Sequence, residues 1–377
     1  MKTDPIDNKI MNIFEHLHNH PEISWHETET TNYIKQILEN HGCKITTFDD
    51  CTGVIGEIGN GDPVVAVRAD MDALWQEVNG RFCANHSCGH DSHMSMVLGV
   101  LLKISEMDSL PQGTIRFIFQ PAEEKGTGAL KMIEKGVIDD VSYMYGVHLR
   151  PVHEVKDNMA APAILHGAGQ HISGEIKGED THGARPHLGV NAIEVGAELL
   201  QKLNHIHADP QVPHSIKFTK FQAGGESSNV IPGSAAFSID IRAQRNDVID
   251  ELASKVKQSV QSVSAFYNVP IELDIGSATA SANSDKNAQK IMSESIGEVL
   301  GEENIAPPVV TSGSEDFHFY TFKKPDLKAT LLGLGCDLKP GLHHPYMTFN
   351  HDMIVPGSEI LLKTVLKTLT HLNKKGD

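Results

Sequence analysis

The spacing of hydrophobic residues before position 168 predicts an α/β structure. Helical stretches alternate with continuous apolar runs, at 64–67, 115–119 and 144–147, of the kind that form strands buried on both faces of a sheet. The polar sequences RAD and QPAEE and a single histidine end these three runs. Because ligands bind outside the carboxyl ends of strands in open α/β sheets, we expect the three polar ends to converge on one site.

A different order of elements occupies residues 169–282. The pattern there predicts a strand, a helix, two strands, a helix and a strand, which is the order of the ferredoxin-like unit. After residue 283 the α/β pattern resumes, with LLGLG as a buried strand and a final amphipathic helix. We therefore expect one domain formed by residues 1–168 and 283–377, with 169–282 inserted as a second domain.

Helical spacing after Asp91 predicts a helix at the start of the most histidine-rich segment. Asp91 is a suitable N-cap, which would place His90 at the helix entrance.

Charge and cysteine usage exclude several classes of function. The formal charge is −17, which argues against nucleic acid or an anionic membrane as a partner. The sequence contains no apolar run of the roughly 20 residues that span a bilayer and no secretory signal, so we expect a cytoplasmic protein. Its five irregularly spaced cysteines do not form a disulfide framework, which leaves a cysteine available as a metal ligand.

The sequence HSCGHDSH at 86–93 places Cys88 and His90 two residues apart, around a glycine that permits a tight turn. Thiolate and imidazole bind zinc, cobalt and manganese-class ions. Alone, a Cys-x-His pair is more often structural than metal-binding.

Adjacent carboxylates and further histidines follow the later strands. In PAEE, Glu123 and Glu124 would repel each other near a crevice unless a cation or a proton compensates them. A two-metal hydrolase uses one carboxylate as ligand and a neighbour as base. His148 ends the next strand, and LHHP offers either His343 or His344. Each motif alone also suits a solvated turn or a core histidine, whereas together they supply enough ligands for two ions.

The motifs RADMDAL, CGHDSH, FQPAEE, GVH, THGARPH, NVIP, GSEDF and LHHP, in this order, closely resemble the dinuclear-metal amidohydrolase family. That family includes auxin-conjugate hydrolases, hippurate hydrolases, N-acyl-amino-acid carboxypeptidases and aminoacylase-like peptidases. The resemblance implies a mixed-sheet catalytic domain of the zinc-peptidase type with an inserted ferredoxin-like dimerisation domain. It also implies a homodimer that cleaves the amide bond of N-acyl or conjugated amino acids.

Site residues follow from the same resemblance. The metal ligands of the family match Cys88, His90, Glu124, His148 and His343, which would hold two divalent ions per subunit, as zinc, manganese or cobalt. Its catalytic base matches Glu123, and Asp70 matches an aspartate that holds a ligand in place. In the inserted domain, His182 matches a histidine that reaches the partner's active site, and Asn229 and Arg242 resemble contacts to the substrate carboxylate.

Two departures from the family pattern concern the site. Trp75 replaces a usual proline before a shortened stretch, and His344 replaces a usual serine, which leaves the fifth ligand open between His343 and His344. A dipeptidase or aminopeptidase could use the same metals, and a non-catalytic metal-binding regulator is the alternative outside enzymes. The absence of H-E-x-x-H, G-x-S-x-G and a dinucleotide-binding G-x-G-x-x-G argues against other common hydrolases and dehydrogenases.

Overall fold

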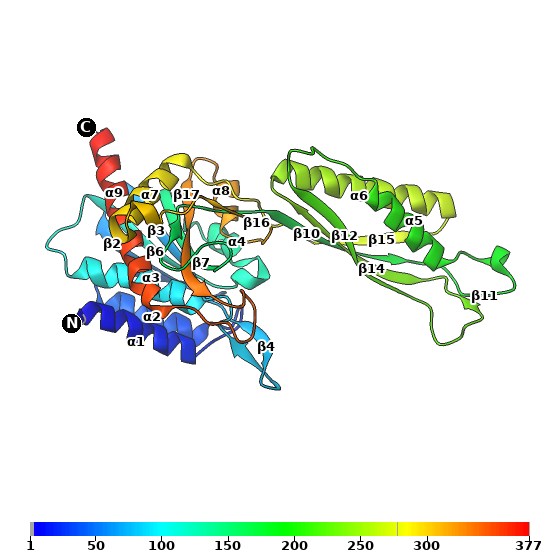
Figure 1. Cartoon of the computed structure of the whole chain (residues 1–377), viewed down its shortest axis with the longest axis horizontal. Coiled ribbons are helices and arrows are strands. Elements are labelled where there is room, and N and C mark those ends of the chain that lie inside the picture. The colour runs from blue at the N-terminus through cyan, green and yellow to red at the C-terminus, as the bar shows by residue number, and fades with distance from the viewer. Residues whose placement is uncertain (1–3, 277, 377) are drawn as a thin grey trace. The chain divides into compact units, whose positions relative to one another are not determined.

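The computed structural model of the protein describes residues 4–276 and 278–376. The chain divides into two compact units (Figure 1). Unit 1 contains the residues up to Leu165, the segment Asn283–Val310 and the residues from Glu315 onward, whereas unit 2 contains His166–Ala282 and Thr311–Ser314. The sequence did not indicate that Thr311–Ser314 would group with unit 2.

A seven-stranded mixed sheet forms the centre of unit 1. Its strands, in spatial order, are β1 (Lys44–Thr47), β2 (Val54–Asn60), β6 (Gly113–Gln120), β3 (Val64–Asp70), β7 (Val141–Pro151), β17 (Lys328–Leu338) and β8 (Ala160–Ala161). The strands β6, β3, β7 and β17 pair in parallel, while β1, β2 and β8 form antiparallel pairs at the edges. Every residue of β3 is buried, which confirms that this apolar run is a strand covered on both faces.

All three predicted strands continue into their polar ends, and β6 includes Gln120. β3 includes Arg68 and Asp70, and β7 continues through His148 to Pro151. Within β3, Arg68 and Asp70 form a buried ion pair with a distance of 2.7 Å, which compensates both charges.

Helices cover the sheet of unit 1 (Figure 1). They are α1 (Pro5–Asn19), α2 (Thr28–Asn40), α3 (His90–Ser105), α4 (Gly128–Glu134), α7 (Lys286–Leu300), α8 (His318–Lys323) and α9 (Ile354–Gly376). Helices α3 and α9 pack on β3 and β7 and on each other, and α1 packs on both helices. Their buried contacts include Phe14, Val97, Leu101, Leu361 and Val365.

The entrance of α3 corrects one expectation. The helix begins at His90, and Gly89 rather than Asp91 is the N-cap. Gly89 has a φ of 88°, a left-handed conformation that glycine adopts without steric cost. His90 thus lies at the helix entrance, as expected, and Asp91 lies in the first turn.

Unit 2 has the predicted ferredoxin-like order. It contains β10 (Ala168–Ile176), α5 (Ala192–Asn204), β12 (His214–Ala223), β14 (Ala235–Ala243), α6 (Asn246–Tyr267) and β15 (Ile271–Ile275). The sheet order is β12-β14-β10-β15, and all neighbouring pairs are antiparallel. The face of α6 that packs on the sheet carries Val248, Leu252, Val256, Val260 and Val263, all buried.

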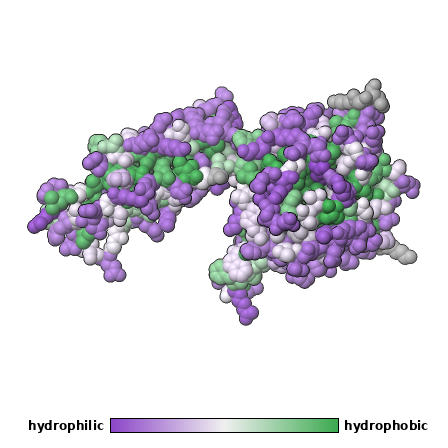
Figure 2. All heavy atoms as spheres, turned by 180° about the vertical axis from the view of Figure 1, so that it is seen from behind, coloured by the Kyte–Doolittle hydropathy of each residue, from purple (hydrophilic) through white to green (hydrophobic). Residues whose placement is uncertain are grey.

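Short elements complete the fold. They are the hairpin β4 (Leu74–Val78) and β5 (Arg81–Asn85), the strands β9 (Ile164–His166), β11 (Thr181–His182), β13 (Val230–Ile231) and β16 (Val309–Thr311), and 3-10 turns at Glu123–Lys125, Pro186–Leu188, Glu302–Asn304 and His351–Met353. Among the described residues, no helix combines the length and apolar character needed to cross a membrane. Hydrophilic residues cover most of the face in Figure 2, with hydrophobic patches on both units.

Candidate metal centre

The candidate ligands come from the ends of neighbouring elements in unit 1. Cys88 and His90 flank Gly89 at the start of α3, and Glu124 lies in the 3-10 turn after β6. His148 lies in β7, and His343 lies in the loop after β17. Because β3, β6, β7 and β17 are parallel neighbours, these residues come together at the carboxyl ends of the strands.

Donor atoms of these residues form two overlapping groups. The donor atoms of Cys88, His90 and His148 lie within 4.8 Å of one another, as do those of Cys88, Glu124 and His343. Cys88 belongs to both groups, so its sulfur can contribute to two neighbouring ions. All five residues that the resemblance matched to metal ligands therefore meet at one place.

The separations between donor atoms suit tetrahedral coordination. The Sγ atom of Cys88 lies 3.5 Å from Nε2 of His148 and 3.3 Å from Nε2 of His343. A sulfur and a nitrogen bound to one zinc ion at their usual bond lengths would be about 3.5 Å apart. In addition, Nε2 of His90 and Oε1 of Glu124 are buried and make no hydrogen bond with any described residue. Orphaned buried donors of this kind are what a metal ion would satisfy.

The contact between His343 and Glu124 is an ion-pair contact rather than a hydrogen bond. Nε2 of His343 lies 3.2 Å from Oε1 of Glu124, yet the carboxylate oxygen has no hydrogen-bond geometry there. By contrast, Nδ1 of His344 accepts the backbone N–H of Tyr346 on the exposed side of the loop. Of the two histidines in LHHP, His343 is the one that the fold places in the ligand cluster.

Charge is concentrated in this buried cluster. Burial raises the pKa of the Cys88 thiol, and the charge of Glu124 raises it further. Hydrogen bonding to Cys88 and the contact with Glu124 raise the pKa of His343 to about 10. Burial lowers the pKa of His90, but the charges of Asp70 and Cys88 and the contact with Asp72 together outweigh burial and raise it well above its ordinary value. Protons therefore compensate the anionic groups in the metal-free protein, and a divalent cation would replace them.

Asp70 contacts His93, a buried histidine in the first turn of α3. Its Oδ1 lies 2.7 Å from Nδ1 of His93, and Nε2 of His93 accepts the N–H of Leu149 at 3.0 Å. Both ring nitrogens of His93 are thereby occupied, so Nδ1 carries the proton that it donates to Asp70. Asp70 lies 3.8 Å from Nε2 of His90, beyond hydrogen-bond distance.

Asp72 contacts three of the site residues, although the sequence did not single it out. Its backbone oxygen lies 2.8 Å from Nδ1 of His90 and turns Nε2 toward the ligand cluster. Its carboxylate accepts the N–H groups of Glu123 and Glu124, each at 3.1 Å, and the hydroxyl of Ser24 at 2.6 Å. One aspartate thus orients a ligand histidine and both glutamates. The second aspartate of RADMDAL was the available signal.

Glu123 lies beside a buried acidic network. Its Oε1 accepts the N–H of Asp316 at 3.4 Å, and Glu315 is close to both residues. Arg68, which is fully buried, donates to Glu315 at 3.1 Å and to Asp316 at 2.9 Å. Burial raises the pKa of Glu123 well above its ordinary value, and the charges of Glu315 and Asp316 raise it further. The role of GSEDF is therefore to form an ion-pair network next to the predicted base, which the sequence alone did not show.

The three residues predicted in unit 2 fall into two places. His182 lies in β11, which pairs with β13, and the backbone oxygen of Asn229 accepts the N–H of Gly183 at 2.7 Å. His182 and Asn229 are therefore neighbours, and both are exposed. Nδ1 of His182 accepts the N–H of Ala184 at 3.0 Å, so its proton lies on Nε2 in the neutral ring.

Arg242 lies elsewhere, near the end of β14 in the four-stranded sheet, whereas His182 belongs to the separate two-stranded sheet of β11 and β13. Arg242 pairs with Gly169 near the start of β10, and its guanidinium donates to Asp240 and, at 2.8 Å, to Oγ of Ser314. These contacts fix the side chain without using all its N–H groups.

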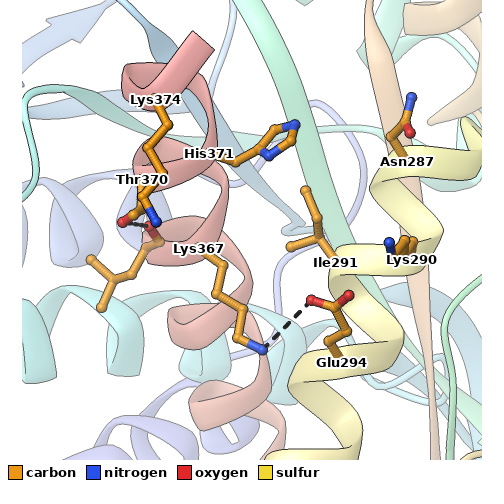
Figure 3. Close-up of a pocket in the computed structure, with 9 residues that line it drawn as sticks. Asn287, Lys290, Ile291, Glu294, Lys367, Thr370, His371 and Lys374 are labelled. Atoms are coloured by element: carbon orange, nitrogen blue, oxygen red, sulfur yellow. Dashed lines mark hydrogen bonds and ion pairs between the residues drawn. The ribbon is translucent and has the colours of Figure 1, made fainter. Parts of the chain in front are cut away.

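A groove between α7 and α9 shares no residue with the ligand cluster (Figure 3). Its volume is roughly 500 Å³, and Ile291 contributes to its apolar part. Lys367, on its rim, lies 4.0 Å from Glu294 and 2.6 Å from Glu298. Lys374 lies in the last turns of α9, where a positive charge interacts favourably with the negative end of the helix dipole. The groove is explained by the packing of two helices and their ion pairs.

Comparison with known sequences gives one family. The model for Peptidase family M20/M25/M40 matches residues 66–367. IAA-amino acid hydrolase ILR1-like 4 of Arabidopsis thaliana is 30% identical over 98% of this chain and 89% of its own length. N-acetylcysteine deacetylase of Bacillus subtilis is 29% identical over 96% of this chain and 98% of its own length.

Solved structures agree with the sequence comparison. A dinuclear metal binding peptidase of the M20 family from Bacillus subtilis has a TM-score of 0.82 and 26% sequence identity. The alignment covers 97% of this chain and 98% of that chain. Both units of the present chain are therefore included in the similarity.

Proposed function

The chain belongs to Peptidase family M20/M25/M40, and on that premise we propose that it hydrolyses the amide bond of N-acyl or conjugated amino acids. One observation carries the proposal. The five residues matched to metal ligands converge around Cys88, and the buried carboxylate of Glu123 lies within 4.8 Å of the donor atoms of His90 and Glu124. A purely structural metal site has no need for such a base. The names of the Arabidopsis and Bacillus relatives, which describe hydrolysis of amino acid conjugates and N-acetylcysteine, support the substrate class.

We propose two divalent ions per subunit, held by Cys88, His90, Glu124, His148 and His343. The set mixes sulfur, nitrogen and oxygen donors, which suits zinc, manganese or cobalt. When bound, such ions polarise a carbonyl and lower the pKa of water.

Glu123 is proposed to move the proton. It accepts a proton from the attacking water and returns that proton to the amide nitrogen, so that the amine can leave. Its burial favours this role, because a raised pKa brings a carboxylate closer to neutral pH. The N–H of Asp316 holds one of its oxygens, and Asp72 fixes its backbone.

Residues of unit 2 are proposed to bind the substrate. Nε2–H of His182 would stabilise the oxyanion, and Asn229 and Arg242 would bind the substrate carboxylate. Arg242 is held by Asp240 and Ser314, which orients a cation for a planar anion.

The geometry of unit 2 supports a homodimer. β10 carries the chain from Ala168 to Ile176, about 26 Å at roughly 3.3 Å per residue. The chain passes between the units near the Ala168 end of β10, where Arg242 pairs with Gly169. His182 instead comes in the sequence after the Ile176 end of this strand. A second copy of the chain is the source of His182 that we propose for each metal centre.

An apolar strip on unit 2 gives the dimer a contact surface. β12 is an edge strand of its sheet, and its Phe221 packs against Gly196 of α5. Ile193 and Leu200 of α5 and Phe221 are exposed hydrophobic residues. Pairing of this strip with its copy would cover all of them.

The cysteines support a cytoplasmic location. The structure shows all five as free thiols. A thiolate ligand and four further thiols suit a reducing compartment, where disulfides are rare.

The substrate class is tested by measuring amine release from metal-reconstituted protein. The panel contains N-acyl amino acids, amino acid conjugates and free dipeptides. We expect turnover of the first two groups and little of the third. Preference for substrates with a free α-amino group would instead show a dipeptidase or aminopeptidase.

The contribution of His182 across the dimer is tested by mixing two inactive variants, Glu123→Gln and His182→Ala. A mixed dimer has one site with both groups intact, so up to about half of the sites should recover activity. No recovery in verified mixed dimers, or full activity of a monomer, would contradict the arrangement.

A further inference from the structure

The hairpin β4–β5 contacts the loop that carries His343. Its turn is Asn79-Gly80, and both residues have positive φ, as a two-residue hairpin turn requires. The hairpin occupies the shortened stretch between RADMDAL and HSCGHDSH, where this sequence departs from its family pattern. Asn85 reaches from the hairpin to the backbone oxygen of Pro345, and Asn79 contacts the hydroxyl of Tyr346.

Gln76 of β4 closes a ring of three hydrogen bonds around His343. Its Nε2 donates to the backbone oxygen of His343 at 2.8 Å, and its Oε1 accepts the hydroxyl of Ser87 at 2.8 Å. The backbone oxygen of Ser87 in turn accepts the N–H of His343 at 2.7 Å. Because Ser87 precedes Cys88, a single side-chain amide joins the two segments that supply Cys88 and His343.

His343 depends on such support more than the other ligands do. Its side chain is 52% exposed, so packing does little to fix its position. Its φ is 64°, a conformation that a residue with a Cβ rarely adopts and that the surrounding structure must stabilise. The other candidates are better fixed: Cys88 is buried in the turn before α3, His90 in α3 and His148 in β7.

We propose that Gln76 is a positioning residue that holds the His343 loop in its metal-binding conformation. This inference rests on the proposed metal centre and adds a determinant that lies in the hairpin. Outer partners of metal ligands typically change metal affinity by about 10- to 100-fold when they are removed. Loss of the Gln76 amide should therefore weaken binding of the ion that His343 holds, and leave the other ion in place.

Two variants separate positioning from packing. Gln76→Ala removes the whole amide, whereas Gln76→Glu has the same shape, keeps an acceptor for Ser87 and loses the donor to His343. Glu77→Ala is the matched control, since Glu77 is the next residue of β4 and is exposed.

The affinity for Zn²⁺ is measured on the full chain by competition with a chromophoric chelator. We expect both Gln76 variants to weaken one of two Zn²⁺ sites by about 10- to 100-fold, with Glu77→Ala unchanged. The visible spectrum of the Co²⁺-loaded protein should change in the Gln76 variants, because it reports the ligands directly. Their kcat should recover at saturating metal with little change in KM, which a general folding defect would not produce.

Several outcomes would overturn the inference. If the wild type binds two ions and both Gln76 variants match it in affinity and spectrum, Gln76 has no positioning role while the proposed function stands. If Glu77→Ala is as impaired as the Gln76 variants, the effect belongs to hairpin stability. A wild type that binds no metal would overturn the proposed function together with this inference.

Discussion

Substitution of Asp72 by Asn tests how the site is held together. The carboxylate is 1% exposed and accepts three hydrogen bonds, from the N–H groups of Glu123 and Glu124 and from the hydroxyl of Ser24. An asparagine keeps the shape and one acceptor oxygen, but its NH₂ group must face at least one of the backbone donors. The substitution therefore leaves one buried N–H unsatisfied and removes the negative charge.

The expected loss of stability follows from these contacts. One unsatisfied buried donor costs about 1–3 kcal/mol. The remaining hydrogen bonds lose their charge assistance, which roughly halves their strength. We expect the free energy of unfolding of the metal-free protein to fall by about 2–4 kcal/mol, within the 5–15 kcal/mol typical of folded proteins. Zinc affinity should also fall, by about 10- to 100-fold, because the Asp72 carboxylate holds the backbone N–H groups of Glu123 and Glu124.

The same variant should alter the pH dependence of stability. Burial raises the pKa of Asp72, but the neighbouring His90, together with the hydrogen bonds from Ser24 and from the N–H of Glu124, outweighs burial and leaves the pKa below its ordinary value. A lowered folded-state pKa contributes stability that is present above the unfolded-state pKa and is lost as pH falls through the folded value. Asp72→Asn should lack this acid-sensitive contribution.

Urea unfolding in the presence of a chelator and Zn²⁺ competition measure the two effects, with the exposed Asp49→Asn as control. If Asp72→Asn stays within about 0.5 kcal/mol of the wild type and binds zinc normally, the account of Asp72 is wrong.

Three further predictions concern the site. Exhaustive chelation should abolish amine release, and Zn²⁺ or Co²⁺ should restore it; activity that survives chelation would exclude a metal role. Cys88→Ser should bind metal more weakly, because a neutral hydroxyl is a poorer ligand than thiolate, so unchanged stoichiometry and affinity would place Cys88 outside the site. Arg68→Met should destabilise the protein by about 3–5 kcal/mol in thermal unfolding, because Asp70, Glu315 and Asp316 would lose their buried cation; an unchanged melting temperature would contradict this.

The spacing of apolar residues predicted the main helices and strands, because the buried face of each element determines which positions are apolar. The continuous run at 64–67 is typical of a strand covered on both faces, and the spacing of Val248, Leu252 and Val256 suits a helix on one face of a sheet, as the structure has them. Boundaries were less predictable. Asp91 looked like an N-cap, yet Gly89 fills that position because the chain turns through a left-handed conformation before His90.

The order of the motifs indicated the candidate metal ligands but not the residues that hold these ligands and the predicted base in place. Cys88 and His343 could be named from sequence, whereas the contact of Asp72 with Glu123 and Glu124 joins segments about fifty residues apart. Similarly, Arg68 meets Glu315 only through the fold. Long-range polar contacts of this kind leave no periodic signal, so the sequence could not show them.

The matched pair Glu123→Gln and Glu124→Gln tests the central claim most directly. For each variant, the metal content per chain is measured together with amine release from an N-acyl amino acid. We expect Glu123→Gln to keep two ions and lose turnover, because an amide cannot accept a proton, and Glu124→Gln to lose metal and activity together. If Glu123→Gln turns over substrate at the wild-type rate, or if it loses metal while Glu124→Gln keeps it, the assignment of base and ligand is contradicted.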